Sequence, residues 1–265
     1  MTAIDAADPT QAPIRCEGIG EVSSNTAVEA AIGKLATTMR LCSEAHMRFD
    51  SIFSVDQEEA VNNLEHAFEN KLEAFHTLFD VSSTLFPYHG HGDTALVMAL
   101  RNAIHHRNHP LFRSFRVRLI LDEPARWQGA AFLMAKHPTI HGASLRMHHF
   151  VRLDDIDARL DPSRDSPFLD RLKAQKALER FELIDRELRL GEVRSKASSE
   201  RYPDDQIYLD VMPIFVSAVC RVFKALKSAG IAFKGFDAET YERPFTSEIV
   251  VDLGRLEFDQ ARIWR

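Results

Sequence analysis

Two stretches of the sequence, TAVEAAIGKLATTMRLC (residues 26–42) and SVDQEEAVNNLEHAFENKLEAFHTLF (residues 54–79), decide the fold. Each begins with Ser or Thr and has Glu or Gln three residues later, which is the capping-box pattern of a helix start. Apolar residues then recur every three or four positions, as they do in a helix with one buried face. We expect one helix that Thr26 caps and that runs to about Phe53, and a second that Ser54 caps and that runs to about residue 82. The short link between them predicts an antiparallel helical hairpin.

A third helix is predicted from about residue 94 to 107, and Pro110 stops it. Drawn at about 100° per residue, this helix has one apolar face and one polar face. The polar face comprises Arg101, Asn102, His105 and His106. A guanidinium group, an amide and two imidazoles therefore share one surface.

Positive charge is concentrated around this helix, although the chain as a whole has a formal net charge of −6. The window from Thr94 to Leu121 contains no Asp or Glu. Its arginines are Arg101, Arg107, Arg113, Arg116 and Arg118. Guanidinium groups form forked hydrogen bonds with phosphate oxygens, and imidazole exchanges protons near neutral pH. The window is therefore suited to phosphodiester chemistry on a nucleic acid.

The segment Arg101-Asn102-Ala-Ile-His-His106 resembles the R-N-x-x-x-H form of the motif of HEPN domains (higher eukaryote and prokaryote nucleotide-binding). The setting of a helical hairpin followed by the motif helix is also similar to that family. HEPN domains are helical bundles, and many are metal-independent ribonucleases of toxin–antitoxin and phage-defence systems. The resemblance implies a homodimer in which two motifs face each other, an RNA substrate, and an antitoxin or regulatory protein as a possible partner.

The resemblance also implies roles for individual residues. Arg101 and His106 are the catalytic candidates, and Asn102 would orient them. The candidates for support are His105, Arg107 and His109, and those for nucleic-acid binding are Arg113, Arg116 and Arg118. The implied reaction is attack of the ribose 2′-OH on the adjacent phosphate, with no metal and no cofactor. A second match to the bare spacing, from Arg40 to His46, has Leu41 where the motif has a polar residue.

Beyond Pro110 the pattern changes. The segment FRVRLIL (residues 115–121) has an apolar residue at every second position, which predicts a strand. Further short strands are expected at 130–136 and 144–151. These strands predict a small β-containing insertion at residues 111–160.

The C-terminal part returns to a helical pattern. Ser166-Pro167 predicts the start of a long helix that ends before Gly191, and a polar link is expected at 192–205. A further helix, with Pro213 at its start or at a kink, ends at Gly230. The fold class is therefore mainly α, a HEPN-like helical bundle with a small β-containing insertion. Its parts are a flexible N-terminal tail at 1–22, the hairpin and motif helix at 23–110, the insertion at 111–160, and C-terminal helices that complete the bundle at 161–265.

Composition places the 265-residue chain among soluble globular proteins, with 45% hydrophobic and 27% charged residues. The three cysteines are far apart in the sequence, which predicts reduced, mostly buried thiols in a cytoplasmic protein. The N-terminus lacks the basic start and apolar run of a signal peptide, and no apolar stretch predicts a membrane span.

Two other functions stay open. The same basic face is compatible with a non-catalytic helical module that binds a partner protein or a nucleic acid. His89 and His91, together with Asp93, have the donor types of a transition-metal site, which makes a metal-dependent hydrolase the third possibility.

Overall fold

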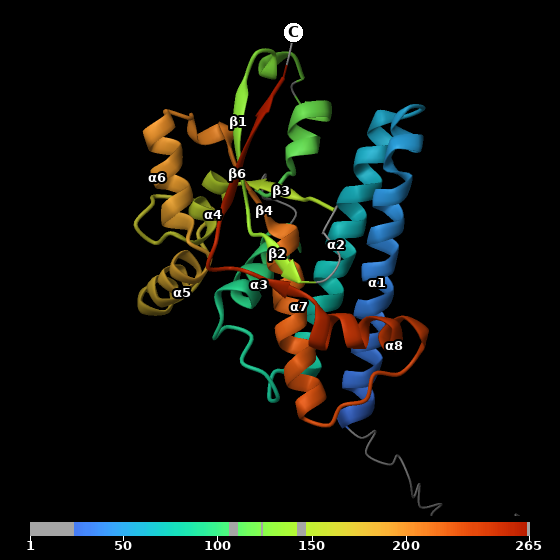
Figure 1. Ribbon diagram of the computed structural model, residues 1–265. Helices are drawn as coiled ribbons and strands as arrows, with labels where there is room; N and C mark the ends of the chain where they lie inside the picture. Colours follow the sequence, from blue (N-terminus) through green and yellow to red (C-terminus); the bar gives the residue numbers. More distant parts are fainter. Residues whose placement is uncertain (1–23, 106–110, 123, 142–146, 264–265) are drawn as a thin grey trace, which may run out of the picture.

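The computed structural model describes residues 24–105, 111–122, 124–141 and 147–263. The protein is mainly helical, with a small sheet, as the sequence predicts (Figure 1). The predicted tail at 1–22 lies outside the described residues. The α-helices are α1 (Ser24–Phe53), α2 (Gln57–Ser82), α3 (Gly92–His105), α4 (Leu153–Leu160), α5 (Ala174–Glu187), α6 (Leu190–Glu200), α7 (Val211–Ser228) and α8 (Phe236–Arg243). The π-helices are η1 (Val117–Asp122) and η4 (Pro244–Glu248), and the 3₁₀ helices are η2 (Pro124–Trp127) and η3 (Asp204–Gln206). The strands are β1 (Ala131–Lys136), β2 (Thr139–His141), β3 (Phe150–Arg152), β4 (Ile207–Asp210), β5 (Val250–Val251) and β6 (Glu257–Arg262).

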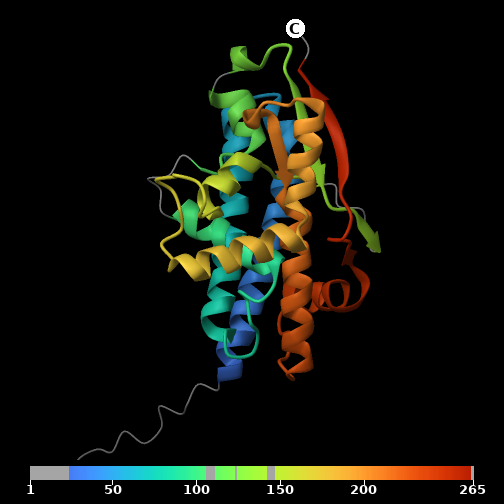
Figure 2. The ribbon, with the colours of Figure 1, turned by 90° about the vertical axis from the view of Figure 1, so that its left-hand side faces the viewer.

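The molecule is arranged around α7 and the sheet. The α1–α2 hairpin stands on one side, α5 and α6 stand on the other, and α3 and α7 lie between them (Figure 1). In the view turned by 90°, α7 again runs beside the hairpin (Figure 2). The rings of Phe75 on α2 and Phe215 on α7 lie 5.9 Å apart between centroids. The hairpin and α7 therefore enclose a common core.

The predicted helical hairpin is confirmed by α1 and α2, although both helices begin at other residues than expected. The N-cap of α2 is Asp56, whose Oδ1 accepts a hydrogen bond from the Glu59 backbone N–H at 2.9 Å. Ser54, the expected cap, lies in the turn before it. Helix α1 has already begun at the position of Thr26, so that residue is not its cap.

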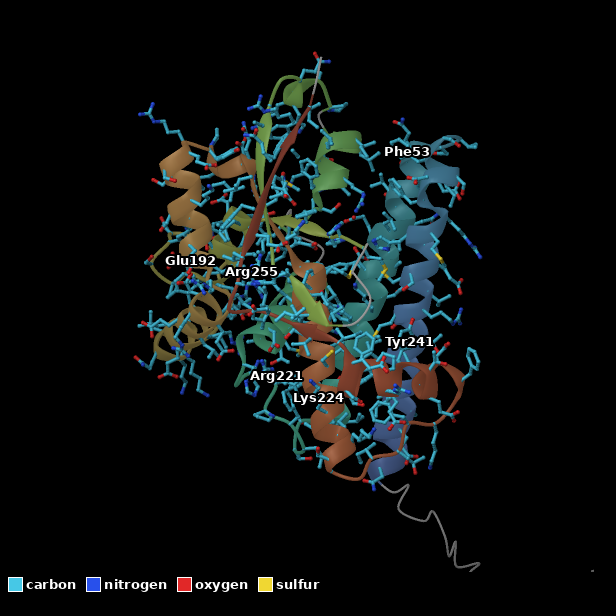
Figure 3. All side chains as sticks on the ribbon, in the orientation of Figure 1. Phe53, Glu192, Arg221, Lys224, Tyr241 and Arg255 are labelled. Carbon is cyan, nitrogen blue, oxygen red and sulfur yellow. The ribbon has the colours of Figure 1, made fainter. Side chains whose placement is uncertain are left out.

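The third predicted helix is confirmed as α3, and its N-terminal end is fixed by two other helices. The buried Asp93 carboxylate accepts hydrogen bonds from Ser217 at 2.8 Å and from Arg221 Nε at 3.1 Å (Arg221 is labelled in Figure 3). The Gly92 backbone N–H donates to Glu187 Oε2 at 2.7 Å. A Cβ at Gly92 would meet the Glu187 Cβ at 2.8 Å, so this close approach requires glycine. These contacts set the direction in which the opposite end of α3, with the motif, points.

The main sheet has the strand order β3-β4-β1-β6. β1 is parallel to β4, and the other neighbours are antiparallel. A separate antiparallel pair joins β2 to β5. The strand predicted at 130–136 is confirmed as β1; of the strand predicted at 144–151, only residues 150 and 151 lie in β3, and residues 142–146 are outside the described ranges. The sheet extends beyond the predicted insertion, because β4 and β6 come from the C-terminal part.

The strand predicted at 115–121 is wrong, because this segment is helical and includes the π-helix η1. Phe115 and Leu119, which are four residues apart, both pack on a small cluster around Trp127 and Tyr208. An apolar residue at every second position over so short a run fits a helical face as well as a strand. The packing against this cluster decides between the two.

The helix predicted to start at Pro167 is also wrong at its start, because α5 begins at Ala174. The guanidinium of Arg159 on α4 donates to the Phe168 carbonyl at 3.0 Å and to the Asp170 carboxylate at 3.1 Å. The Arg159 carbonyl accepts from the Asp170 backbone N–H at 3.0 Å. These tertiary hydrogen bonds hold the segment in an irregular conformation.

Residues 192–205 are not the predicted polar link, because α6 occupies most of them. Arg189, in the left-handed region at φ 55°, separates α5 from α6. Gly191 therefore lies inside a helix instead of following one.

The last long predicted helix is confirmed as α7, and β4 precedes it. Its N-cap is the fully buried Asp210, whose Oδ1 accepts from the Met212 backbone N–H at 3.0 Å. Pro213 lies in the first turn, where a backbone N–H has no helical partner to lose. Gly230 follows the helix at φ 80°. Cys42 and Cys220 are buried, free thiols as predicted, and Cys16 is outside the described residues.

Candidate active site

The described part of the motif gathers around one carboxylate, Glu73 of α2. Arg101 Nη2 and Nε lie 2.9 Å and 3.2 Å from Glu73 Oε2. The Nδ1 atom of His105 lies 3.2 Å from Glu73 Oε1. Arg101 Nη1 donates to the Asn102 side-chain oxygen at 3.3 Å. The structure therefore brings three of the predicted site residues together, and it adds Glu73.

The helical pattern of α3 explains this arrangement. Leu96, Val97 and Leu100 are buried against the core, so the opposite face of the helix turns toward α2 and solvent. The side chains of Arg101 and His105 are 17% and 56% exposed, and that of Glu73 is 42% exposed. The cluster is therefore open to solvent on one side.

Opposite charges control the ionisation of Glu73. Burial raises the pKa of its carboxyl, but the hydrogen bonds from Arg101 and the positive charges of Arg101 and His105 outweigh that effect. The pKa of Glu73 therefore lies below its ordinary value, and the residue is a carboxylate at neutral pH. A phosphate that binds the Arg101 guanidinium has to replace this carboxylate.

The remaining motif residues, His106, Arg107 and His109, lie outside the described residues. Their roles stay predictions from the sequence.

The three arginines predicted to bind nucleic acid are all engaged within the chain. Arg113 Nη2 pairs with Asp122 at 2.7 Å, and Arg118 Nη2 pairs with Asp155 at 2.9 Å. The remaining one, Arg116, donates from Nη1 to the His148 carbonyl at 2.9 Å. Arg113 is the most exposed of the three, with half of its side chain accessible.

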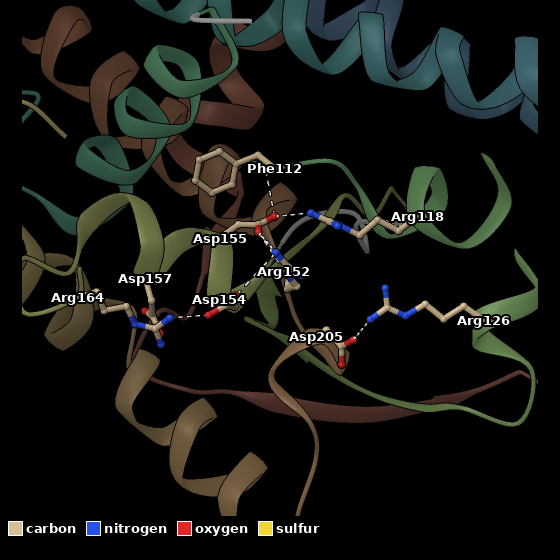
Figure 4. A network of polar contacts seen from close by, with 9 residues as sticks. All are labelled: Phe112, Arg118, Arg126, Arg152, Asp154, Asp155, Asp157, Arg164 and Asp205. Atoms are coloured by element: carbon tan, nitrogen blue, oxygen red, sulfur yellow. Dashed lines mark hydrogen bonds and ion pairs between the residues drawn. The ribbon is translucent and has the colours of Figure 1, made fainter. Parts of the chain in front are cut away.

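Asp155 is the centre of a second arginine–carboxylate cluster, drawn in Figure 4. This carboxylate is fully buried, and Arg118, Arg152 and the Phe112 backbone N–H all donate to it. The neighbouring Asp154 pairs with Arg164 from the following loop. The sequence pattern predicted no site role for these aspartates.

A cavity of about 470 Å³ lies beside this second cluster. Its charged lining residues are Asp154, Asp157, Asp204, Arg164, Arg194 and Arg201. Three negative and three positive side chains leave no net charge to attract an anion. Two of the arginines are also engaged, because Arg164 and Arg194 both pair with Asp157.

A carboxylate–imidazole pair was not anticipated from the sequence. The Nδ1 atom of His148, before β3, lies 2.6 Å from the Oδ2 atom of the buried Asp210. Asp210 also accepts the backbone N–H of His149 at 3.0 Å. Residues so far apart in the chain give no local signal of their contact.

His89, His91 and Asp93, which were considered for a metal site, each contact a different partner. The ring of His91 stacks on Phe86, the ring of His89 meets Phe79 edge-on, and Asp93 is bound to α7 as described above. Within the described ranges, no group of three or more His, Cys, Asp or Glu residues is placed to hold a metal ion.

Comparison of the chain with protein-family models, curated proteins and solved structures finds no match. Among the helices of the described residues, none combines the length and apolarity needed to cross a membrane.

Proposed function

We propose that this protein is a metal-independent endoribonuclease of the HEPN type. The observation that carries the proposal is the cluster at the end of α3, where Arg101, Asn102 and His105 meet at one partly exposed site. Two nitrogen-rich side chains that share a single carboxylate form a site that a phosphodiester can enter by displacing that carboxylate.

In the proposed reaction, Arg101 takes up the phosphate in place of Glu73. Its guanidinium then stabilises the negative charge that develops on the phosphate oxygens. His106 acts as general base or general acid for attack by the ribose 2′-OH, and the products are a cyclic phosphate and a 5′-OH. Such proton transfer accelerates a reaction by roughly 10²–10⁴-fold.

The proposal includes a homodimer, in which a second His106 serves the other proton transfer. It also includes a toxin or phage-defence role, with an antitoxin or regulatory protein as partner. Sedimentation of the purified protein tests the dimer, and growth arrest on expression that disappears in His106→Ala tests the role.

The direct test is incubation of the purified protein with total RNA and tRNA in EDTA. We expect cleavage by the wild type that leaves cyclic-phosphate ends, and none by Arg101→Ala or His106→Ala. The matched control is Arg40→Ala, because Arg40 is also a helical arginine paired with an acid of another helix, Asp237. Cleavage by all variants alike counts against this site, and RNA binding without turnover supports the non-catalytic module instead.

A further inference from the structure

A lysine amine lies buried inside the protein, away from the motif. Lys71 of α2 is 2% exposed. Its Nζ donates to the thioether sulfur of Met212 at 2.6 Å. The rings of Phe68 and Phe215 lie beneath it, with centroids 4.7 Å and 4.4 Å from Nζ. No carboxylate of the described residues forms an ion pair with this amine.

Burial favours the neutral form of the amine, although the faces of the two phenyl rings favour the charged form. Burial lowers the pKa of Lys71, and the more distant Cys42 and Asp210 oppose this effect only in part. The rings of His149 and His46, which also lie near Lys71, have their pKa values lowered mainly by burial. A lowered pKa raises the neutral fraction of the amine, and the neutral form has the free electron pair that makes lysine a nucleophile.

Lys71 also lines a cavity. The cavity has a volume of about 60 Å³ and lies between α1, α7, α8 and η4. Its walls are mostly apolar, with Met39, Phe215 and Phe245 among them, and Tyr241 of α8, which is labelled in Figure 3, borders it. At roughly 15 Å³ for each probe-sized group, this space holds about four non-hydrogen atoms. A two- or three-carbon carbonyl compound has that size.

We propose that Lys71 is a covalent binding site for a short aliphatic aldehyde. The Nζ electron pair adds to the carbonyl carbon, and a proton moves from nitrogen to oxygen to give a carbinolamine. The carbinolamine then loses water, which takes the second amine hydrogen, and a carbon–nitrogen double bond forms. No oxidant, reductant or metal takes part in these steps. The apolar walls hold the alkyl group, and the exclusion of water favours the imine.

The test is trapping with propionaldehyde and cyanoborohydride at pH 7, with the full-length protein and no RNA. Reduction converts the imine to a stable propyl-lysine, which peptide mass mapping locates. Because a lowered pKa leaves more of an amine neutral at pH 7, we expect Lys71 to react several-fold faster than the exposed Lys224 of α7. Equal rates at the two lysines, or no reaction at Lys71, overturn the proposal.

A second aldehyde tests the cavity. A bulky aromatic aldehyde has more atoms than the space holds, so we expect it to modify Lys224 and leave Lys71 unmodified. Modification of Lys71 by both aldehydes refutes a size-selective site. The fast-reacting position should disappear in Lys71→Met and persist in Lys224→Met. Since the readout is a mapped adduct on the wild-type chain, it depends neither on the folding of a variant nor on ribonuclease activity.

Discussion

Two arginine–carboxylate clusters of this protein differ in what surrounds them. Asp155 is fully buried, and two guanidinium groups and a backbone N–H donate to it (Figure 4). Glu73 is 42% exposed and holds Arg101 and His105 at the open end of a helix. The same pair of chemical groups is therefore in the interior in one cluster and at the surface in the other.

This difference in burial indicates in which of the two clusters a ligand can replace the carboxylate. A buried carboxylate with several donors is costly to remove, because the mostly buried cations it leaves behind have little water to solvate them. A half-exposed pair contributes little to stability, and solvent or a ligand can take the place of either partner. We therefore expect Asp155 to stabilise the fold, and the Glu73 cluster is the one that the proposed function uses.

The largest expected effect is on stability, in Asp155→Ala. Because Arg118 and Arg152 lose their common partner, we expect the free energy of unfolding to fall by about 3–5 kcal/mol. Chemical denaturation measures this change. The matched control is Asp154→Ala, since Asp154 is 32% exposed and its loss should cost at most about 1 kcal/mol. Similar losses in both variants would remove the basis of the comparison.

The next effect is on cleavage, in Arg101→Ala. We expect RNA cleavage to fall by about 10²–10³-fold, because the charge on the phosphate is no longer stabilised. The free energy of unfolding should change by only about 1 kcal/mol, as the pair with Glu73 is partly exposed. A large loss of stability with unchanged cleavage of the remaining folded protein would assign Arg101 to the structure instead.

A third acid, Glu65 of α2, is partly buried, between the fully buried Asp155 and the more exposed Glu73. Burial raises the pKa of its carboxyl to about 7, although hydrogen bonds from Ser114 and the charge of Arg116 oppose the rise. Its ordinary value is 4.5, so between pH 4.5 and 7 the folded state binds more protons than the unfolded state. Stability therefore falls as the pH rises through this window, by about 3.5 kcal/mol at about 1.4 kcal/mol per pKa unit.

Glu65→Gln should remove this part of the pH dependence. Denaturation at pH 5 and pH 8 measures it, and the variant should lose less stability between the two pH values than the wild type. Glu182→Gln, an exposed substitution on α5, is the control and should follow the wild type. Parallel curves for Glu65→Gln and the wild type contradict the prediction.

The smallest expected effect is on RNA affinity, in Glu73→Gln. The amide keeps the size of the side chain but does not compete with phosphate as a charge, so RNA should bind several-fold more tightly. Fluorescence anisotropy with a short RNA measures this, in a His106→Ala background that prevents cleavage. Glu69→Gln, one turn earlier on α2, should have a weaker effect. Weaker binding in Glu73→Gln would show that the carboxylate helps to bind RNA.

The sequence alone determined the long helices of this protein. The hairpin, α3 and α7 were all predicted, because each carries an apolar stripe at helical spacing over three or more turns. The polar face of α3, with Arg101 and His105, followed from the same periodicity. Caps were predicted less well, since Asp56 stands two residues from Ser54 and both can cap a helix.

Only the tertiary structure decided the short segments and the partners of the charged side chains. Residues 115–121 are helical because Phe115 and Leu119 pack on the Trp127 cluster, and the sheet forms from strands as far apart in the chain as β1 and β6. Glu73 meets Arg101, and Lys71 is enclosed by Met212, because α2 packs against other helices. Periodicity reports which face of an element is buried, but the free energy of a contact depends on what the fold brings to that face.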